Sequence, residues 1–509
     1  MLFTFAPVKR KKFLLEKILV TGYAAEGKSV ARFDGKVYFV EGAVPGDVVD
    51  VFISTNKKDW GEGKATNFHE YSKERVEPFC QHFGLCGGCK WQMLPYDRQL
   101  VYKQQEVAQN LKRIGKVDLP EILPIVGCAA TTQYRNKLDF TFSNKRYLTS
   151  EEIKENPLPK KEFTAITAET ATSGLKAIAA TSENNAVLAK IAPNEPGGAL
   201  GFHVPRIFDK IIEIQTCYLM DEVNNSIRNT IRDFATLQQY TYHDIKQHTG
   251  WLRNIIIRYC TTGELMVNIC LNNEDEAATK KLMEHILLQV PSITTLLYTI
   301  NAKWNDSIYD LTPTVYFGKG YVIEQLEEFK FKIGPKSFFQ TNTKQAEKLY
   351  NITKDFAQLT GNEIVYDLYC GTGSIGIFLS KGAKKVIGVE TIPEAIEDAK
   401  ENAALNNINH ASFFAGDVIK ICTDDFFTEH GRPDVIITDP PRAGMHEKLV
   451  NKLLDIAAPK IVYVSCNTAT QARDIALLAE KYSVIKIQPV DMFPHTHHIE
   501  CVVLLQLKN

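Results

Sequence analysis

Hydrophobic and polar positions change their period several times along the chain. From Leu14 to about Asn67, short alternating segments are separated by glycine and proline, which predicts a small all-β barrel with turns at Asp34-Gly35 and Pro45-Gly46-Asp47. A polar stretch from about Asp97 to Ile114 has the spacing of a helix. The amino-terminal part is therefore expected to be a separate barrel followed by a helix.

The middle of the chain, from Gln133 to about Glu327, alternates strand-like and helical runs and predicts an α+β domain. Its strand-like runs are YRNKLDFTFS, ALGFHVP, KIIEIQTC, WLRNIIIRYC and ELMVNICL. Residues near 148–198 have little periodicity and are rich in Ala, Thr, Ser, Glu and Lys, so we expect a flexible or partly helical insertion there. The pattern assigns no chemistry to this insertion.

From about Gly361 onward, strands and helices alternate regularly. This alternation predicts an α/β, Rossmann-like fold with a doubly wound, mainly parallel sheet, whose ligand sites lie where the strands end. A chain of 509 residues is too long for one hydrophobic core, so several domains are expected. We place them at 8–72 (a small barrel), 73–132 (a cysteine-rich segment and helix), 133–330 (the α+β domain with its insertion near 148–198, expected to bind RNA) and 331–509 (the Rossmann-like domain).

Composition adds few constraints. The chain has 44% hydrophobic and 23% charged residues, as globular proteins do, and a net charge of −1 that does not single out a nucleic-acid partner. A surface for RNA would have to be a local patch such as Lys9–Lys12. Apolar runs stay well below the roughly 18 residues that span a bilayer, and the opening apolar piece precedes its basic cluster, the reverse of a secretory signal. We therefore expect a cytoplasmic protein that does not associate with membranes.

The Rossmann-like part carries a glycine-rich turn. Asp367 ends its first strand, and Cys370–Gly376 matches GxGxxG, which by itself is a weak signal for a nucleotide because any tight strand-to-helix turn can have it. Glu390 ends the second strand, where it could bind ribose hydroxyls. Asp417 ends the third, where it could meet an adenine amino group. A nicotinamide dinucleotide and S-adenosylmethionine remain equally compatible with these positions.

The later strands favour a methyl donor. The fourth strand ends at Asp439 in TDPPR, and the fifth ends at Cys466 in SCN, neither of which a hydride-transfer enzyme needs. A thiolate that adds to C6 of uracil makes C5 an enolate carbon able to attack a methyl sulfonium. Cys466 is a candidate for this nucleophile, although a cysteine at a strand end is otherwise more often a buried packing residue.

The same chemistry requires a base that removes the C5 proton. Glu500 precedes the last apolar strand and would face Cys466 if that strand runs antiparallel to its neighbours. The alternatives are a solvated glutamate at a strand start, and His497 or His498 as the base because their pKa lies nearer neutrality. The three histidines of HTHHIE could also indicate a metal site, but no acidic or cysteine ligands accompany them at suitable spacing.

The eleven cysteines are not expected to form disulfides in a cytoplasmic protein. Cys80, Cys86 and Cys89 form a cluster with glycines between them, and either Cys128 or Cys217 could supply a fourth thiolate. Tetrathiolate sites hold zinc or an iron–sulfur cluster. The spacing therefore predicts a metal centre without choosing between these two.

These residues together resemble a known family. The segments YRNK (134–137), SFFQTN (337–342), DLYCGTG, DPPR, SCN and HIE are typical of RNA uracil-C5 methyltransferases. Over nearly its whole length the chain resembles most closely the bacterial branch that modifies 23S ribosomal RNA. The barrel resembles a TRAM domain, an OB-like module that binds RNA.

The resemblance implies a class I methyltransferase domain, S-adenosylmethionine as methyl donor, a 4Fe-4S cluster, and RNA, specifically 23S ribosomal RNA, as partner, with no obligate protein partner. It also implies that the target base is flipped out of its stack. By position, Cys466 is the nucleophile and Glu500 the base. The remaining implied residues are donor contacts at Gln340, Tyr369, Ser374, Glu390, Asp417 and Asp439, and cluster ligands at Cys80, Cys86, Cys89 and Cys217.

Three other functions compete with this one. A tRNA-modifying branch shares the catalytic domain but lacks the barrel and the cysteine cluster. An amino-methyltransferase would also have an Asp-Pro-Pro corner, but it usually places an aromatic residue where this chain has Arg442. The third alternative is a non-enzymatic iron–sulfur module that binds or folds RNA.

Overall fold

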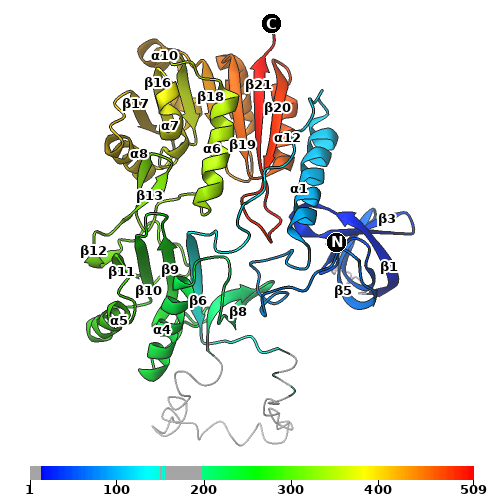
Figure 1. The fold of residues 1–509 in the computed structure, drawn as a ribbon, viewed down its shortest axis with the longest axis vertical. Coiled ribbons are helices and arrows are strands. Elements are labelled where there is room, and N and C mark those ends of the chain that lie inside the picture. Colours follow the sequence, from blue (N-terminus) through cyan, green and yellow to red (C-terminus); the bar gives the residue numbers. More distant parts are fainter. Residues whose placement is uncertain (1–12, 150–151, 153, 155–197) are drawn as a thin grey trace, which may run out of the picture.

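The computed structural model describes residues 13–149, 152, 154 and 198–509, which form a small barrel and two larger sheet domains (Figure 1). The barrel lies beside the helix α1 (Tyr96–Asn110), the central domain lies at the lower left of the view, and the carboxy-terminal domain lies above it. The insertion expected near 148–198 lies almost entirely outside the described residues.

The amino-terminal domain is a closed barrel with strand order β1-β2-β3-β5-β4. Alternate side chains point inward, and Val20, Val40 and Val51 are at most 1% exposed. Asp34 (φ 49°) and Gly35 (φ 70°) form the two-residue turn between β2 and β3, both in the left-handed region that such hairpin turns require. Its strands are β1 (Phe13–Tyr23), β2 (Ser29–Phe33), β3 (Lys36–Glu41), β4 (Val48–Asn56) and β5 (Trp60–Glu70).

The helix predicted from Asp97 to Ile114 is confirmed as α1, which continues into a π-helical turn at Leu111–Gly115. Val107 and Leu111 are fully buried in the core of the carboxy-terminal domain. Further along, Ile122 forms a parallel bridge with Ile487 of that domain. This segment therefore packs as part of the last domain, although the central domain separates the two in sequence.

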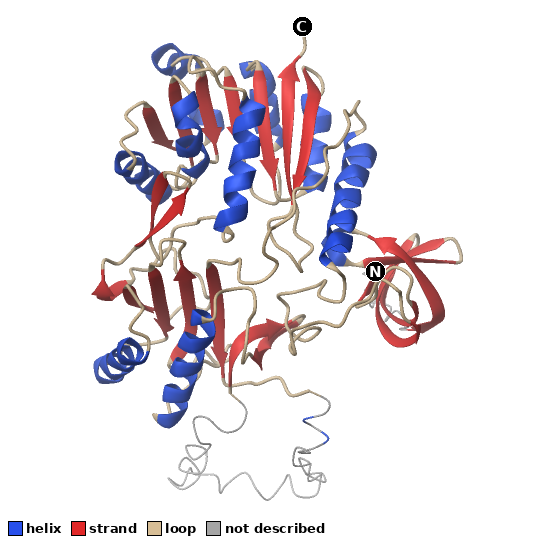
Figure 2. Cartoon of the chain, viewed as in Figure 1, coloured by secondary structure: helices blue, strands red, loops and turns tan. Residues whose placement is uncertain are grey.

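The central domain is a seven-stranded sheet of order β12-β11-β10-β9-β6-β7-β8, with two neighbouring helices packed on it (Figure 2). β9 and β10 are almost wholly buried, in keeping with their continuous apolar runs. The helix α5 begins at an N-cap, Asp275, which accepts a hydrogen bond from the Ala278 amide. The elements are β6 (Lys137–Ser143), β7 (Ala199–Val204), β8 (Ile207–Glu213), α4 (Val223–Leu237), β9 (Leu252–Tyr259), β10 (Leu265–Leu271), α5 (Glu276–Gln289), β11 (Thr295–Ile300) and β12 (Thr314–Gly318).

The hairpin β13 (Val322–Leu326) and β14 (Phe329–Ile333) connects the central domain to the last one. The last domain is a seven-stranded sheet of order β17-β16-β15-β18-β19-β21-β20. Its first five strands are parallel, and β21 is antiparallel to β19, as expected. The strands are β15 (Ile364–Leu368), β16 (Lys385–Glu390), β17 (Ala411–Ala415), β18 (Val435–Thr438), β19 (Lys460–Ser465), β20 (Tyr482–Val490) and β21 (Glu500–Leu507).

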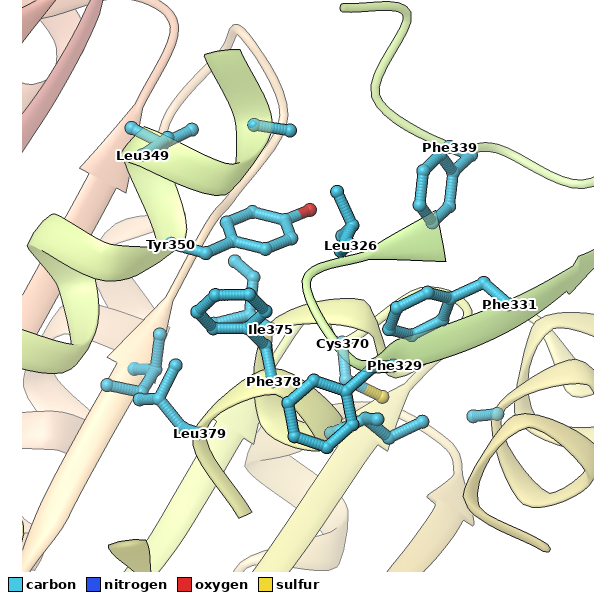
Figure 3. Packing of buried hydrophobic residues seen from close by; sticks show 14 of the residues in the cluster. Leu326, Phe329, Phe331, Phe339, Leu349, Tyr350, Cys370, Ile375, Phe378 and Leu379 are labelled. Carbon is cyan, nitrogen blue, oxygen red and sulfur yellow. The ribbon is translucent and has the colours of Figure 1, made fainter. Parts of the chain in front are cut away.

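Helices cover both faces of this sheet (Figure 2). Alternate residues of one strand enter opposite cores, because Val365 packs with α6, α7 and α8 whereas Tyr366 packs with α11 and α12. On the first face, aromatic side chains from the hairpin and from α6 and α7 pack together, including Phe331, Tyr350 and Phe378 (Figure 3). The helices are α6 (Thr343–Ala357), α7 (Ser374–Leu379), α8 (Pro393–Leu405), α9 (Val418–Ile421), α10 (Asp424–His430), α11 (Glu447–Ile456) and α12 (Thr468–Leu478).

Within the described ranges, no helix combines the length and the apolar character needed to cross a membrane.

Candidate active site

The glycine-rich turn connects β15 to α7 and brings the helix close to the strand. Gly371 (φ 52°) and Gly373 (φ 77°) have left-handed backbones. The Gly376 amide donates to Asp367 Oδ2 at 2.8 Å, and a Cβ at Gly376 would lie 2.9 Å from that oxygen. Since such a contact is too short, only glycine allows this approach of the helix to the buried Asp367.

Two of the residues predicted to contact the methyl donor, Glu390 and Tyr369, lie directly at this turn. Glu390, at the end of β16, accepts the Gly371 amide at 3.3 Å, and its other oxygen accepts the Thr391 amide at 2.7 Å. Tyr369 is half-buried and has a positive φ of 62°. The Glu390 carboxylate at the end of β16 is thus held against the glycine-rich turn, where a nucleoside could lie.

The other predicted contacts are spread around the same edge. Asp417 is exposed, and its carboxylate caps α9 by accepting the Ile419 amide at 2.8 Å. Ser374 shares a 2.9 Å hydrogen bond with the hydroxyl of Tyr350. Gln340 is half-buried in the segment before α6, where its carbonyl accepts from the Asn136 side chain at 3.0 Å.

The predicted nucleophile and base are neighbours across an antiparallel strand pair. Ser465 pairs with Cys501 between β19 and β21, so Cys466 and Glu500, each one residue away, lie at the same end of the two strands. Asp439 follows β18, the parallel neighbour of β19. The edge therefore gathers a thiol and two carboxyls, and Glu500 is only 6% exposed.

The electrostatics of this group are unusual. Burial raises the pKa of Asp439 to about 7, and burial together with the Asp439 charge raises the pKa of Glu500 well above its usual value. Burial, Glu500 and Asp439 raise the pKa of the Cys466 thiol to about 11, while the Arg442 guanidinium, which hydrogen-bonds the thiol, opposes that shift. These shifts favour the protonated thiol and oppose ionisation of the two carboxyls.

The segment 491–499 before β21 contains the three histidines. Burial lowers the pKa of His495 and His497 to about 4 and that of His498 to about 3. His498 Nδ1 lies 2.6 Å from Arg442 Nη2, a geometry that requires a neutral ring accepting from the guanidinium. The described part of the chain contains no group of three or more His, Cys, Asp or Glu side chains arranged to hold a metal ion, so the three-histidine metal site is not supported.

A buried ion pair that sequence reasoning missed holds this segment. Lys103 of α1 donates to Asp491 Oδ1 at 2.7 Å with both side chains fully buried, and the Tyr96 hydroxyl donates to Asp491 Oδ2 at 2.7 Å. Gln99 accepts the His495 amide at 2.8 Å. The available signal was the position of Gln99 and Lys103 on the same buried face of α1 as Val107.

The cysteine-rich segment reaches both the central domain and the active-site loop. Cys80, Cys86, Cys89 and Cys217 line one cavity of ≈ 330 Å³. Cys128 lies elsewhere, with its thiol donating to the Asp491 carbonyl at 3.1 Å. The amides of Lys90 and Trp91 donate to the His495 carbonyl at 2.8 and 3.0 Å. The four thiols that line the cavity are a chemically suitable donor set for an iron–sulfur cluster. Among the described residues they do not form a group close enough to hold a metal ion.

The strand order, the glycine-rich turn and the acidic strand ends define an S-adenosylmethionine-dependent methyltransferase. The fold matches that of a tRNA (uracil-54, C5)-methyltransferase from Pyrococcus abyssi, solved in complex with S-adenosyl-L-homocysteine. The match has a TM-score of 0.68 at 24% identity and covers 96% of this chain and 100% of that one.

Sequence comparisons give the family. The tRNA (Uracil-5-)-methyltransferase family model matches residues 312–508, and the TRAM domain model matches residues 15–66. An RNA methyltransferase of Bacteroides thetaiotaomicron is 51% identical over 95% of this chain and 100% of its own length. One from Chlorobaculum tepidum is 36% identical over 98% of both chains. The chain belongs to the RNA uracil-5-methyltransferase family and is an enzyme, so the non-enzymatic alternative is wrong.

Proposed function

We propose that the enzyme methylates C5 of a uridine in RNA through a covalent bond between Cys466 and C6. The thiolate adds to C6, and the resulting enolate attacks the methyl group of S-adenosylmethionine, releasing S-adenosylhomocysteine. A base then removes the C5 proton, the C5=C6 double bond re-forms, and the thiolate leaves. The observation that carries this proposal is the position of Cys466 beside Glu500 at the end of β19 and β21.

Glu500 is the base in this proposal. Its raised pKa makes it a stronger base than an ordinary carboxylate, whereas burial leaves His497 and His498 weaker bases than a free histidine. The sulfonium of the donor adds a positive charge near two carboxyls and a thiol, which favours the charged forms of all three. Donor binding thereby prepares both the thiolate and the base.

The donor contacts we propose lie around the glycine-rich turn. Glu390 binds the ribose, and Asp417 reaches the adenine amino group, for which it would give up its capping bond to α9. Asp439 lies between the turn and the thiol, at the end of β18. The complete proposed set is Gln340, Tyr369, Ser374, Glu390, Asp417 and Asp439.

Two variants test the mechanism. Cys466→Ala is expected to abolish methyl transfer, and Glu500→Gln to accumulate an RNA-linked protein that migrates slowly on a denaturing gel. Cys422→Ala is the control, because Cys422 is buried in the hydrophobic core. Normal turnover by Cys466→Ala, or a product methylated elsewhere than C5, would refute the mechanism; a methylated exocyclic amine would support the amino-methyltransferase instead.

We propose 23S ribosomal RNA as the substrate, on the strength of the resemblance to the bacterial branch that has both the barrel and the cysteine cluster. A tRNA substrate is the second candidate, because the matching family model and the Pyrococcus abyssi enzyme are both described as acting on tRNA. Mass-spectrometric mapping of 5-methyluridine in ribosomal and transfer RNA, from cells with and without the gene, distinguishes the two.

We further propose that Cys80, Cys86, Cys89 and Cys217 hold a 4Fe-4S cluster. When bound, it would cross-link the cysteine-rich segment to the central domain. Support comes from the cavity that these four thiols share and from the separate position of Cys128. Iron and acid-labile sulfide analysis of anaerobically purified protein tests this: Cys217→Ser should lose both, and Cys128→Ser should keep both.

A further inference from the structure

At the end of the central domain where β9 begins, exposed Phe208, Lys246 and Trp304 lie with half-buried His248 in a group of aromatic and basic side chains, here called the aromatic–basic strip. Trp304 is 80% exposed and Phe208 is 64% exposed. The Lys246 ammonium lies 5.4 Å from the centre of the Phe208 ring, and the His248 ring lies 3.8 Å from that of Trp304. Because Lys246 and His248 are two residues apart in one loop, the two contacts belong to the same part of the surface.

The loop that carries Trp304 is held rigidly by a buried arginine. Arg253 is 2% exposed and donates to the carbonyls of Lys303 at 2.7 Å and Asn305 at 3.2 Å, to the Asn301 carbonyl, and to Asp306 Oδ1 at 2.9 Å. Because this buried guanidinium donates to several carbonyls of the loop, it holds the loop in one conformation. A tryptophan left in water on such a loop forgoes the apolar burial it could provide, and Phe208 of the same strip is exposed as well. Exposed apolar side chains that occur together are typical of a binding surface.

The loop that carries Lys246 and His248 is equally constrained. Asp244 Oδ1 accepts the amides of Lys246 at 2.8 Å and Gln247 at 3.1 Å, and the Asn272 side chain donates to the His248 carbonyl at 3.4 Å. Gly250 (φ 90°) passes so close to the Tyr242 carbonyl that no side chain fits there. Both loops therefore present their side chains without further ordering, which lowers the entropic cost of binding.

We propose that the aromatic–basic strip binds a single-stranded segment of the RNA substrate outside the methylated uridine. Exposed rings beside an ammonium group match the bases and phosphates of a single strand, since rings stack on bases and ammonium groups bind phosphates. The exposed Trp304 ring, which His248 contacts at a tilt of 46°, is the stacking group, and Lys246 is the phosphate contact. Lys246 also pairs with Asp209 at 2.5 Å, yet its side chain remains 52% exposed and available to a phosphate.

The proposal deepens the proposed function, because it assumes an RNA substrate but not a particular chemistry on it. Binding is therefore measured apart from methyl transfer, by fluorescence anisotropy of a labelled single-stranded RNA segment with the full-length protein. Trp304→Ala should weaken binding roughly 5- to 100-fold, and Trp304→Phe should retain most of the affinity because a phenyl ring still stacks. Lys246→Gln should reduce the slope of log affinity against log salt by about 1.

Leu288→Ala is the control, since Leu288 is 75% exposed and lies on α5. In turnover with the full RNA substrate, Trp304→Ala should raise KM and leave kcat unchanged. Unchanged affinity in Trp304→Ala, or equal loss in Leu288→Ala, overturns the proposal. If the protein proves not to make 5-methyluridine but Trp304→Ala still loses RNA affinity, the strip stands and the proposed function fails.

Discussion

At the scale of single residues, the carboxyl edge of the parallel sheet brings together two buried carboxyls and a thiol, whose ionised forms are unfavourable there. Asp439 follows β18 and Glu500 begins β21, on either side of β19. Burial raises the pKa of both carboxyls, the Asp439 charge raises that of Glu500 further, and both carboxylates raise the pKa of the Cys466 thiol. Acidic groups with a raised pKa are arranged for proton transfer or for binding a cation, at the expense of stability. Binding of the positively charged methyl donor would make ionisation of these groups more favourable.

Asp439→Asn is expected to stabilise the free enzyme at alkaline pH while abolishing its activity. The pKa of Asp439 is about 7 in the folded chain and near 3.8 in the unfolded chain, so its stabilising contribution is complete below about pH 4 and is lost as pH rises through 7. Asp439→Asn does not lose this contribution, so its free energy of unfolding at pH 8.5 should exceed that of the unmodified enzyme by on the order of 1 kcal/mol or more. Thermal unfolding between pH 5 and pH 8.5 measures the gain, which should shrink toward pH 5.

Asp455→Asn, an exposed position on α11, is the control for this experiment. If Asp455→Asn gains as much stability as Asp439→Asn, the electrostatic interpretation is contradicted. It is also contradicted if Asp439→Asn has the melting temperature of the unmodified enzyme at every pH.

Two glycines of the barrel share a backbone conformation but differ in their surroundings. Gly27 and Gly35 both have φ 70°. A Cβ at Gly27 would lie 3.0 Å from His497 Cβ and 3.2 Å from the Trp91 indole nitrogen, whereas nothing lies within 4 Å at Gly35. Gly27→Ala should therefore reduce methyl transfer by moving the barrel away from the segment before Glu500, while Gly35→Ala costs only the backbone strain of about 1 kcal/mol. Melting temperatures and turnover of both variants decide this; equal effects on turnover would contradict it.

At the scale of elements, α1 and the segment 491–499 depend on each other. The segment has little regular structure, and its position is set by Lys103, Gln99 and Tyr96 of the helix. Because Glu500 directly follows this segment, helix α1 positions the proposed base without itself contacting the reacting groups.

Lys103→Met should destabilise the fold by about 3–5 kcal/mol, because it leaves the buried Asp491 carboxylate without its charge partner. Denaturant unfolding measures this loss, and hydrogen exchange should show faster exchange in residues 491–499. The matched control is Lys112→Met, an exposed lysine in the turn that continues the helix. Similar losses in both variants would show that the ion pair is not the cause.

At the scale of the whole molecule, the methyltransferase domain is built from two separated parts of the chain. Val107 and Leu111 lie in its core, and the stretch from Ile122 to Val126 bridges to β20. The expected domain at 73–132 therefore divides in space between the cysteine-rich loop and a helix that packs on the last domain. The central domain is inserted between these two parts.

A fragment of residues 331–509 is expected to be poorly soluble and to melt well below the full chain. It would expose the core surface that α1 covers and leave Asp491 buried without Lys103. A fragment in which residues 94–130 are joined to 331–509 by a flexible linker should recover a cooperative transition. Calorimetry of the two fragments tests this; equal stability would mean that the helix is dispensable.

Local patterns were sufficient for the elements and for much of the proposed site. Alternation gave the barrel, regular strand–helix succession gave the Rossmann-like sheet, and the antiparallel last strand correctly brought Glu500 to the same edge as Cys466. These features depend on residues close in sequence or on a topology common to the fold class. The choice of Cys217 over Cys128 beside the cysteine cluster instead followed from family resemblance.

What the sequence by itself determined is the type of each element and the chemistry carried at each strand end, because backbone preference and side-chain spacing are local properties. Only the tertiary structure decided which distant groups meet: Lys103 with Asp491 across 388 positions, the barrel turn at Gly27 with His497, and the four residues of the aromatic–basic strip. Those contacts depend on how whole elements pack, and packing optimises buried area and paired charge over the entire chain.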